Sequence, residues 1–123
     1  MSKHHETGRE GERLARQHLQ TLGYVVEATS YRHGRVELDL IARTADDCLV
    51  FVEVKTRRGL GFGHPSAAVT PAKEENIARA AGAYMEEIGH EWEVRFDIIS
   101  VLLYKDGSHD LEHLEDAFFP GLF

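Results

Sequence analysis

The residues best suited to chemistry are two carboxylates and a lysine on neighbouring β-rich segments. Asp39 lies in residues 36–42, where apolar and charged side chains alternate. Glu53 and Lys55 lie in residues 49–56, the strongest strand pattern in the chain. Alternate residues of a strand share a face, and strands joined by a tight turn usually pair as neighbours. Asp39 and Glu53 are therefore expected to lie side by side, with Lys55 further along the same face. A solvated sheet face with alternating acids and bases would give the same pattern.

Two charged residues on the expected helices favour a functional site. Glu12 falls within the apolar stripe of a helix over residues 7–22, and Lys73 falls within that of a helix over residues 71–88. A charge on the buried side of a helix is costly unless it is paired or bound to a metal. Lys73 is also unfavourably placed because the first turn of a helix prefers anions. The alternative for both is a long side chain that reaches solvent at a helix end.

Three carboxylates would then converge on one site, namely Glu12, Asp39 and Glu53, with Glu37 as a further accessory acid. At a separation of about 6 Å and an effective dielectric of about 20, each pair repels by roughly 3 kcal/mol. Lys55 cannot offset three such repulsions, so a proton or a divalent cation must join the cluster. An all-oxygen ligand set favours Mg²⁺ or Mn²⁺ over zinc. Such an ion can activate water and neutralise a phosphate, while Lys55 orients the nucleophile or stabilises the pentacovalent state.

The elements that must position these residues follow the order α-β-β-β-α-β. The expected ranges are a helix at 7–22, strands at 24–28, 36–42 and 49–56, a helix at 71–88 and a strand at 93–103. This order predicts a single α/β domain over residues 1–123, with a mixed sheet flanked by helices. Gly23 and Gly89 are natural stops for the two helices, and Thr70 is a natural N-cap for the second one.

The composition argues against a membrane-spanning, secreted or disulfide-stabilised protein. The chain has 123 residues, enough for one domain with a modest core, and 42% of them are apolar. No apolar run approaches the roughly 18 residues of a membrane span, so no membrane association is expected. The N-terminal residues lack the apolar stretch of a secretory signal. The single cysteine, Cys48, excludes an internal disulfide framework, which fits a cytoplasmic location.

The charge is unevenly distributed along the chain. The net charge of −7 argues against a protein that coats nucleic acid through its overall field. Residues 1–58 nevertheless carry a balance of +1, against −8 for residues 59–123. Since the candidate site accounts for four of the nine acids in the first half, the remainder of that half is basic and could accept a polyanion.

Three cations are the candidate phosphate contacts. Arg57 and Arg58 begin a glycine-rich loop that runs to Pro65, and the third cation is Lys73. A solvated edge is the alternative for the two arginines. His109 and His113 are spaced as zinc ligands could be, but without a companion ligand they do not predict a zinc site.

The ordered series of motifs resembles a known family. Asp39, a spacer of thirteen residues and Glu53-Val54-Lys55 resemble the D-(x)n-E-x-K signature of the restriction-endonuclease-like, or PD-(D/E)xK, superfamily. The whole chain is more closely similar to the YraN family of bacterial proteins, relatives of archaeal Holliday-junction resolvases. The shared motifs include Gly8-x-x-Gly11-Glu12-x-x-Ala15, Glu37-Leu-Asp-Leu-Ile-Ala42, Phe51-Val-Glu-Val-Lys-Thr-Arg57 and Arg95-Phe-Asp-Ile98.

This resemblance implies a restriction-endonuclease-like α/β fold and a role for each site residue. Asp39, Glu53 and the Val54 carbonyl would hold the metal. Glu12 would complete the metal site from the first helix, and Lys55 would be the catalytic lysine. The chain departs from the family at two positions that flank the site and bear on substrate detail. Val36 replaces the usual Gly before Glu37, and Ser30 replaces the usual Asn before Tyr31-Arg32.

The expected function is metal-dependent hydrolysis of DNA phosphodiesters, with branched DNA among the substrates that the resemblance suggests. One alternative is a catalytically silent DNA-binding or partner-binding module of the same fold. Another is an acidic protein-interaction module, which rests on the charge of residues 59–123. The net acidity and small size favour a homodimer or a helper protein for tight binding to DNA.

Overall fold

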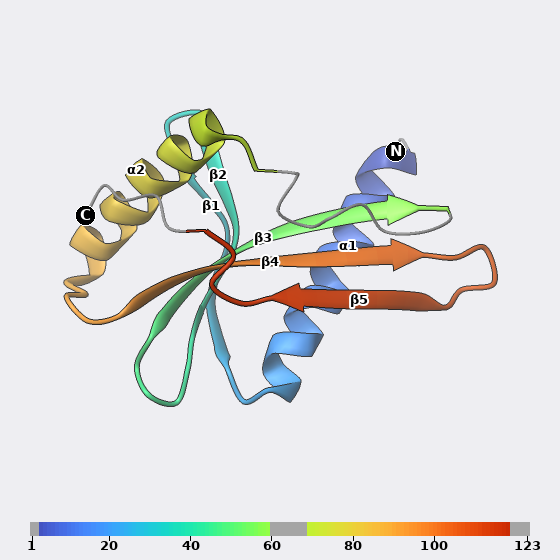
Figure 1. Ribbon diagram of the computed structural model, residues 1–123, viewed down its shortest axis with the longest axis horizontal. Helices are drawn as coiled ribbons and strands as arrows, with labels where there is room; N and C mark the ends of the chain where they lie inside the picture. The colour runs from blue at the N-terminus through green and yellow to red at the C-terminus, as the bar shows by residue number, and fades with distance from the viewer. Residues whose placement is uncertain (1–2, 60–68, 119–123) are drawn as a thin grey trace.

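The protein is a five-stranded sheet with one helix on each face, here as a computed structural model that describes residues 3–59 and 69–118 (Figure 1). In chain order the elements are α1 (Lys3–Thr21), β1 (Val25–His33), β2 (Val36–Arg43), β3 (Leu49–Arg58), α2 (Pro71–Ile88), β4 (Val94–Leu103) and β5 (His109–Leu114). The strands lie in the order β1-β2-β3-β4-β5, and β3 and β4 form the parallel pair. The mixed α/β sheet flanked by helices that the sequence predicts is confirmed.

Several elements differ from the sequence-based expectation. α1 begins at Lys3 and not at residue 7, and β3 includes Arg57 and Arg58, which were expected to begin a loop. β1 continues to His33, five residues beyond the strand expected at 24–28. β5 was not predicted, because its sequence, His109-Asp-Leu-Glu-His-Leu114, is mostly polar and contains only two apolar residues. It forms at the edge of the sheet by antiparallel pairing with β4. Neither described helix is long and apolar enough to cross a membrane.

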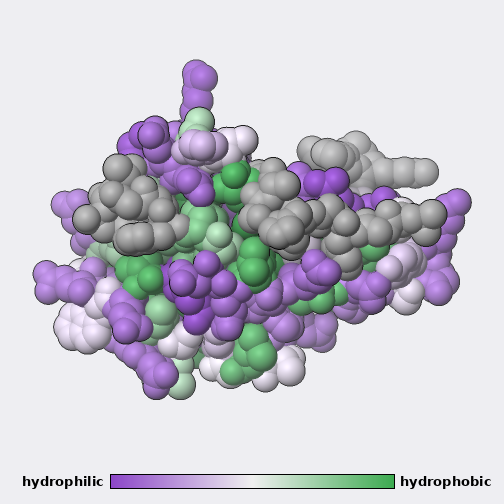
Figure 2. All heavy atoms as spheres, viewed as in Figure 1, coloured by the Kyte–Doolittle hydropathy of each residue, from purple (hydrophilic) through white to green (hydrophobic). Residues whose placement is uncertain are grey.

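The core consists of two clusters separated by the sheet. α1 contributes Leu14, Ala15 and Leu19 to one cluster, which it shares with Val50 and Val52 of β3. α2 contributes four residues to the other, Ile77, Ala80, Ala81 and Tyr84, which pack against the opposite face of β3. The face seen in Figure 2 is mostly hydrophilic, with hydrophobic residues visible between the hydrophilic ones. Each helix therefore covers its own part of the sheet and can bring a side chain to the strands from its own side.

β2 and β3 separate partway along their length. They pair from Arg43↔Leu49 to Leu40↔Val52, and beyond this point β2 pairs only with β1. Figure 1 shows the two strands running in different directions from there. A regular strand would place Leu38 and Leu40 on one face, yet they lie in different core clusters. We call the place where the strands part, between Asp39 and Glu53, the fork.

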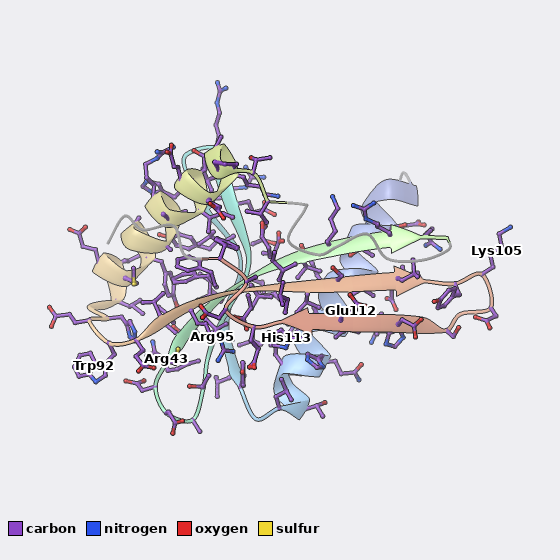
Figure 3. All side chains as sticks on the ribbon, in the orientation of Figure 1. Arg43, Trp92, Arg95, Lys105, Glu112 and His113 are labelled. Carbon is purple, nitrogen blue, oxygen red and sulfur yellow. The ribbon has the colours of Figure 1, made fainter. Side chains whose placement is uncertain are left out.

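A buried polar network joins β4 to the chain after β5. Asp97 is fully buried and accepts hydrogen bonds from Arg95 Nε and Nη2, each at 2.9 Å. It also accepts from His113 Nε2 at 2.7 Å and from the backbone N–H of Asp116 at 3.0 Å. Burial raises the pKa of Asp97, but the hydrogen bonds from His113 and Arg95 outweigh it and the net shift is downward. Figure 3 shows Arg95 and His113 close together near the middle of the sheet.

α1 approaches β3 closely at a glycine. A Cβ atom added to Gly11 would lie 1.7 Å from Thr56 Oγ1 and 2.7 Å from Thr56 Cβ. The helix can therefore lie against the strand at this point only because residue 11 has no side chain. The next residue is Glu12, so this contact also sets how far Glu12 stands from the sheet.

We expect Gly11→Ala to destabilise the protein by about 1–3 kcal/mol, since the added methyl forces α1 away from Thr56. The matched control is Gly8→Ala on the same helix, where a Cβ meets nothing within 4 Å. That change should stabilise by up to about 1 kcal/mol through helix propensity alone. Urea unfolding measures both. Equal effects of the two substitutions would contradict the close contact.

Candidate functional site

The fork is held open by a side chain that replaces a backbone partner. Continued pairing beyond Leu40↔Val52 would bring Val54 opposite Leu38. Instead the N–H of Val54 donates to Asp39 Oδ2 at 2.8 Å. In antiparallel pairing the N–H and C=O of one residue point to the same neighbouring strand. The Val54 carbonyl therefore also points into the fork, beside the Asp39 carboxylate.

Three carboxylates meet at the fork from α1 and β2. Oxygens of Glu12, Glu37 and Asp39 all lie within 4.8 Å of one another. The pKa of Glu12 is raised by its burial and then by repulsion from Asp39 and Glu37. Glu37 Oε2 lies 3.2 Å from Nη2 of Arg32 on β1. This guanidinium offsets part of the negative charge of the three carboxylates. The apolar stripe of α1 predicts that Glu12 faces the sheet, and in the structure Glu12 lies beside Glu37 and Asp39, the two acids that the strand pattern places on one face.

Glu53 meets Asp39 from the other strand. Its side chain is 14% exposed, and Lys73 Nζ of α2 lies 3.5 Å from its Oε2. That oxygen is buried and has no hydrogen-bond partner among the residues that the structure describes. Burial, and then repulsion by and hydrogen bonding to Asp39, raise the pKa of Glu53 to about 8. The pKa of Asp39 is raised as well, first by burial, despite the hydrogen bonds from Val54 and Glu53. Both shifts follow from the burial of two carboxyl groups beside each other.

A groove of about 620 Å³ adjoins the fork. Its lining includes Gly8 and Glu12 from α1 and Val54, Lys55, Arg57 and Arg58 from β3. Arg58 Nε donates to Thr7 Oγ1 at 2.7 Å, which ties the end of β3 to α1. One side of the groove is therefore acidic and the other basic. A second hollow, of about 590 Å³ around Tyr24 and Arg95, contains none of the predicted metal-binding, catalytic or phosphate-binding residues.

The structure brings most of the predicted site residues together. Glu12 and Asp39 are direct neighbours, and Glu53 contacts Asp39, although it lies outside the group of three acids within 4.8 Å. Lys55 lies in the groove with Glu12. Lys73 lies against Glu53 from the α2 side, outside that lining. The expectation that Lys73 is on the buried side of the helix is wrong, because its side chain is 49% exposed and reaches solvent at the start of α2 while its ammonium contacts Glu53.

The charge state of Glu53 gives a pH-dependent prediction. A carboxyl whose pKa is raised on folding binds its proton more tightly in the folded state, so wild type loses stability as pH rises from about 4.5 to about 8. Glu53→Gln removes this loss. In EDTA, we expect the free energy of unfolding of the variant to rise relative to that of wild type by up to about 1.4 kcal/mol per pH unit in that window. Above the window, the difference between the two proteins should stay constant. Urea unfolding from pH 5 to 9 measures the difference. Parallel stability curves would contradict a protonated Glu53.

Comparison with known proteins places the chain in a family. Residues 11–101 match the uncharacterised protein family UPF0102. A UPF0102 protein of Chlorobaculum tepidum is 42% identical over 93% of this chain and 92% of its own length. One from Bacteroides thetaiotaomicron is 40% identical over the full length of both chains, and one from Porphyromonas gingivalis is 43% identical over 96% of this chain and 87% of its own. The resemblance to YraN proteins is thereby confirmed, and the chain belongs to the uncharacterised protein family UPF0102.

Proposed function

We propose that this protein is a metal-dependent endonuclease that hydrolyses phosphodiester bonds in DNA. The observation that carries the proposal is the meeting of four carboxylates at the fork beside a groove with three cations. The carboxylates are those of Glu12, Glu37, Asp39 and Glu53, and the cations are those of Lys55, Arg57 and Arg58. This is the arrangement expected of the PD-(D/E)xK type, in which acids hold a metal beside a phosphate-binding surface.

The donor set fits a hard divalent cation. All four side chains offer oxygen ligands, which Mg²⁺ and Mn²⁺ prefer. Among the described residues, Glu53 Oε2 has no hydrogen bond and only the Lys73 ammonium 3.5 Å away, and the pKa values of Glu12, Asp39 and Glu53 are all raised. These carboxyls are therefore poorly neutralised by the protein itself. Glu12, Asp39, Glu53 and the Val54 carbonyl would hold the ion, with Glu37 as an accessory. A bound ion supplies Lewis acidity and lowers the pKa of a water molecule.

The residues of the groove supply the remaining functions. Lys55 is exposed and lies in the same groove as Glu12, so its ammonium can orient the attacking water or stabilise charge on the phosphate. Arg57 and Arg58 lie further along β3 and can bind neighbouring phosphates through their guanidinium groups. Phosphate contacts of this kind fix the register of DNA without reading its sequence.

A second candidate is a DNA-binding or partner-binding module without catalysis. The contact of Lys73 with Glu53 favours it, because a lysine that neutralises Glu53 reduces the need for a metal. The two candidates share the groove and differ in whether the metal-binding acids and Lys55 perform a reaction.

The first test is catalytic. We expect purified protein to nick DNA in the presence of Mn²⁺ or Mg²⁺ but not in EDTA. Lys55→Ala should lower the rate by at least about a hundredfold, as removal of one group that stabilises transition-state charge does elsewhere. Asp39→Ala should do the same through loss of the metal. A panel of labelled single-stranded, duplex and branched DNA measures the activity. Lys105→Ala, on the exposed turn between β4 and β5, is the matched control (Figure 3).

Binding measured on the same panel separates the two candidates. Wild-type protein that binds DNA but cleaves no substrate with either ion would favour the silent module. Cleavage that Lys55→Ala leaves unchanged would refute the assigned role of this lysine.

The second test concerns phosphate contacts. We expect DNA affinity to fall with salt, and Arg57→Ala to flatten the log–log slope by about one contact. Lys73→Ala should have the same effect if an ion at the fork frees this lysine from Glu53, so the titration includes Ca²⁺, which also prefers oxygen ligands. Arg79→Ala, an exposed cation on the same helix, is the control and should leave the slope unchanged. Unchanged slopes for Arg57→Ala and Lys73→Ala would exclude both residues from the interface.

A further inference from the structure

We propose that His18 and His113 form a second metal site, selective for a late transition ion such as Zn²⁺, Ni²⁺ or Cu²⁺, which connects α1 to β5. His18 Nε2 lies 3.0 Å from His113 Nδ1, within hydrogen-bond distance, and a bound ion would replace this hydrogen bond between the rings. The ring centroids are 5.1 Å apart, and the planes are nearly perpendicular, at 77°. His18 belongs to the last turns of α1 and His113 to β5, so the pair joins segments that are far apart in the sequence.

The orientation of His113 is fixed by a buried carboxylate. Its Nε2 donates to Asp97 Oδ2 at 2.7 Å, and Asp97 is fully buried. Arg95 holds both oxygens of Asp97, and the N–H of Asp116 donates to one of them. The hydrogen of a neutral His113 is therefore on Nε2, and its Nδ1 lone pair faces His18. A carboxylate that accepts from one ring nitrogen while the other ligates is the arrangement that orients histidine ligands in metal sites.

The spacing fits a small ion. A tetrahedral ion with bonds of about 2.0–2.1 Å separates two nitrogen ligands by about 3.3 Å, so the rings need to part by about 0.3 Å. His18 is half-buried, which leaves a path for the ion from solvent, whereas the His113 side chain is 9% exposed. A neutral imidazole can carry its hydrogen on either nitrogen. His18 can therefore ligate through Nε2 with its hydrogen on Nδ1, and no proton is lost.

The ligand type separates this site from the fork. Two imidazoles favour zinc, nickel and copper, whereas the oxygens of the fork favour magnesium and manganese. Among the described residues, the one group of three candidate ligands within 4.8 Å of one another is at the fork. Water must therefore complete the coordination at the histidine pair. An ion held by one ligand from α1 and one from β5 stabilises the docking of the helix on the sheet.

The experiment titrates Ni²⁺, Zn²⁺ and Cu²⁺ by calorimetry into the full-length protein in millimolar Mg²⁺, which occupies the oxygen ligands of the fork. His4→Ala/His5→Ala serves as the background throughout, because these N-terminal histidines could bind the same ions. We expect one equivalent of ion to bind and to raise the melting temperature, since a ligand of the native state stabilises it. His18→Gln should abolish both effects. His109→Gln, on the same strand as His113 but exposed, is the matched control and should change neither.

Two further measurements keep the proposal testable if a variant is unstable. Cu²⁺ bound to the background protein should show an electron paramagnetic resonance spectrum with two nitrogen ligands. Asp97→Asn should weaken binding by about 10–100-fold if it remains folded by circular dichroism. A background protein that binds no equivalent would overturn the proposal. So would a spectrum without nitrogen ligands, or a His18→Gln variant that binds as well as His109→Gln does.

Discussion

Where β2 leaves β3, the N–H of Val54 loses the backbone acceptor that continued pairing would give it. The carboxylate of Asp39 takes that place at 2.8 Å. Because an unpaired N–H inside a protein costs about 1–3 kcal/mol, the separation of the strands needs an acceptor at this position. Asp39 is thereby held in the gap between the strands, where Glu12 reaches it from α1 and Glu53 from β3. The concentration of negative charge at the fork follows from this one hydrogen bond.

The cations that balance this charge are placed at its margins. Arg32 pairs with Glu37 on the β1 side, and Lys73 pairs with Glu53 on the α2 side. Glu12 and Asp39 lie between these two ion pairs, and burial raises the pKa of both carboxyls. Among the described residues, neither acid forms an ion pair of 4.0 Å or less. The uncompensated charge thus lies at the centre of the fork, next to the Val54 carbonyl and the groove of Lys55. A divalent cation would therefore stabilise the carboxylates most strongly at this position.

The sequence indicates the site better than it indicates the strands around it. The alternating pattern places Asp39 and Glu53 on adjoining strands, and the helix stripe turns Glu12 inward, because both depend on local periodicity. Leu38 and Leu40 lie in different core clusters because β2 separates from β3 between them. No local sequence pattern indicates where the two strands separate. Asp97 lies within a strongly apolar strand, and its partner His113 is brought to it by an edge strand too polar to be predicted.

α1 connects the two candidate sites. Glu12 at the fork and His18 at the histidine pair are six residues apart on this helix, about 9 Å along its axis. Between the helix and β3, the absence of a side chain at Gly11 sets the distance to Thr56. A rigid helix that contributes a ligand to each site cannot shift at one without shifting at the other. An ion at the histidine pair would therefore favour the same docked position of α1 that brings Glu12 to Asp39, which is the physical requirement for energetic coupling between two sites.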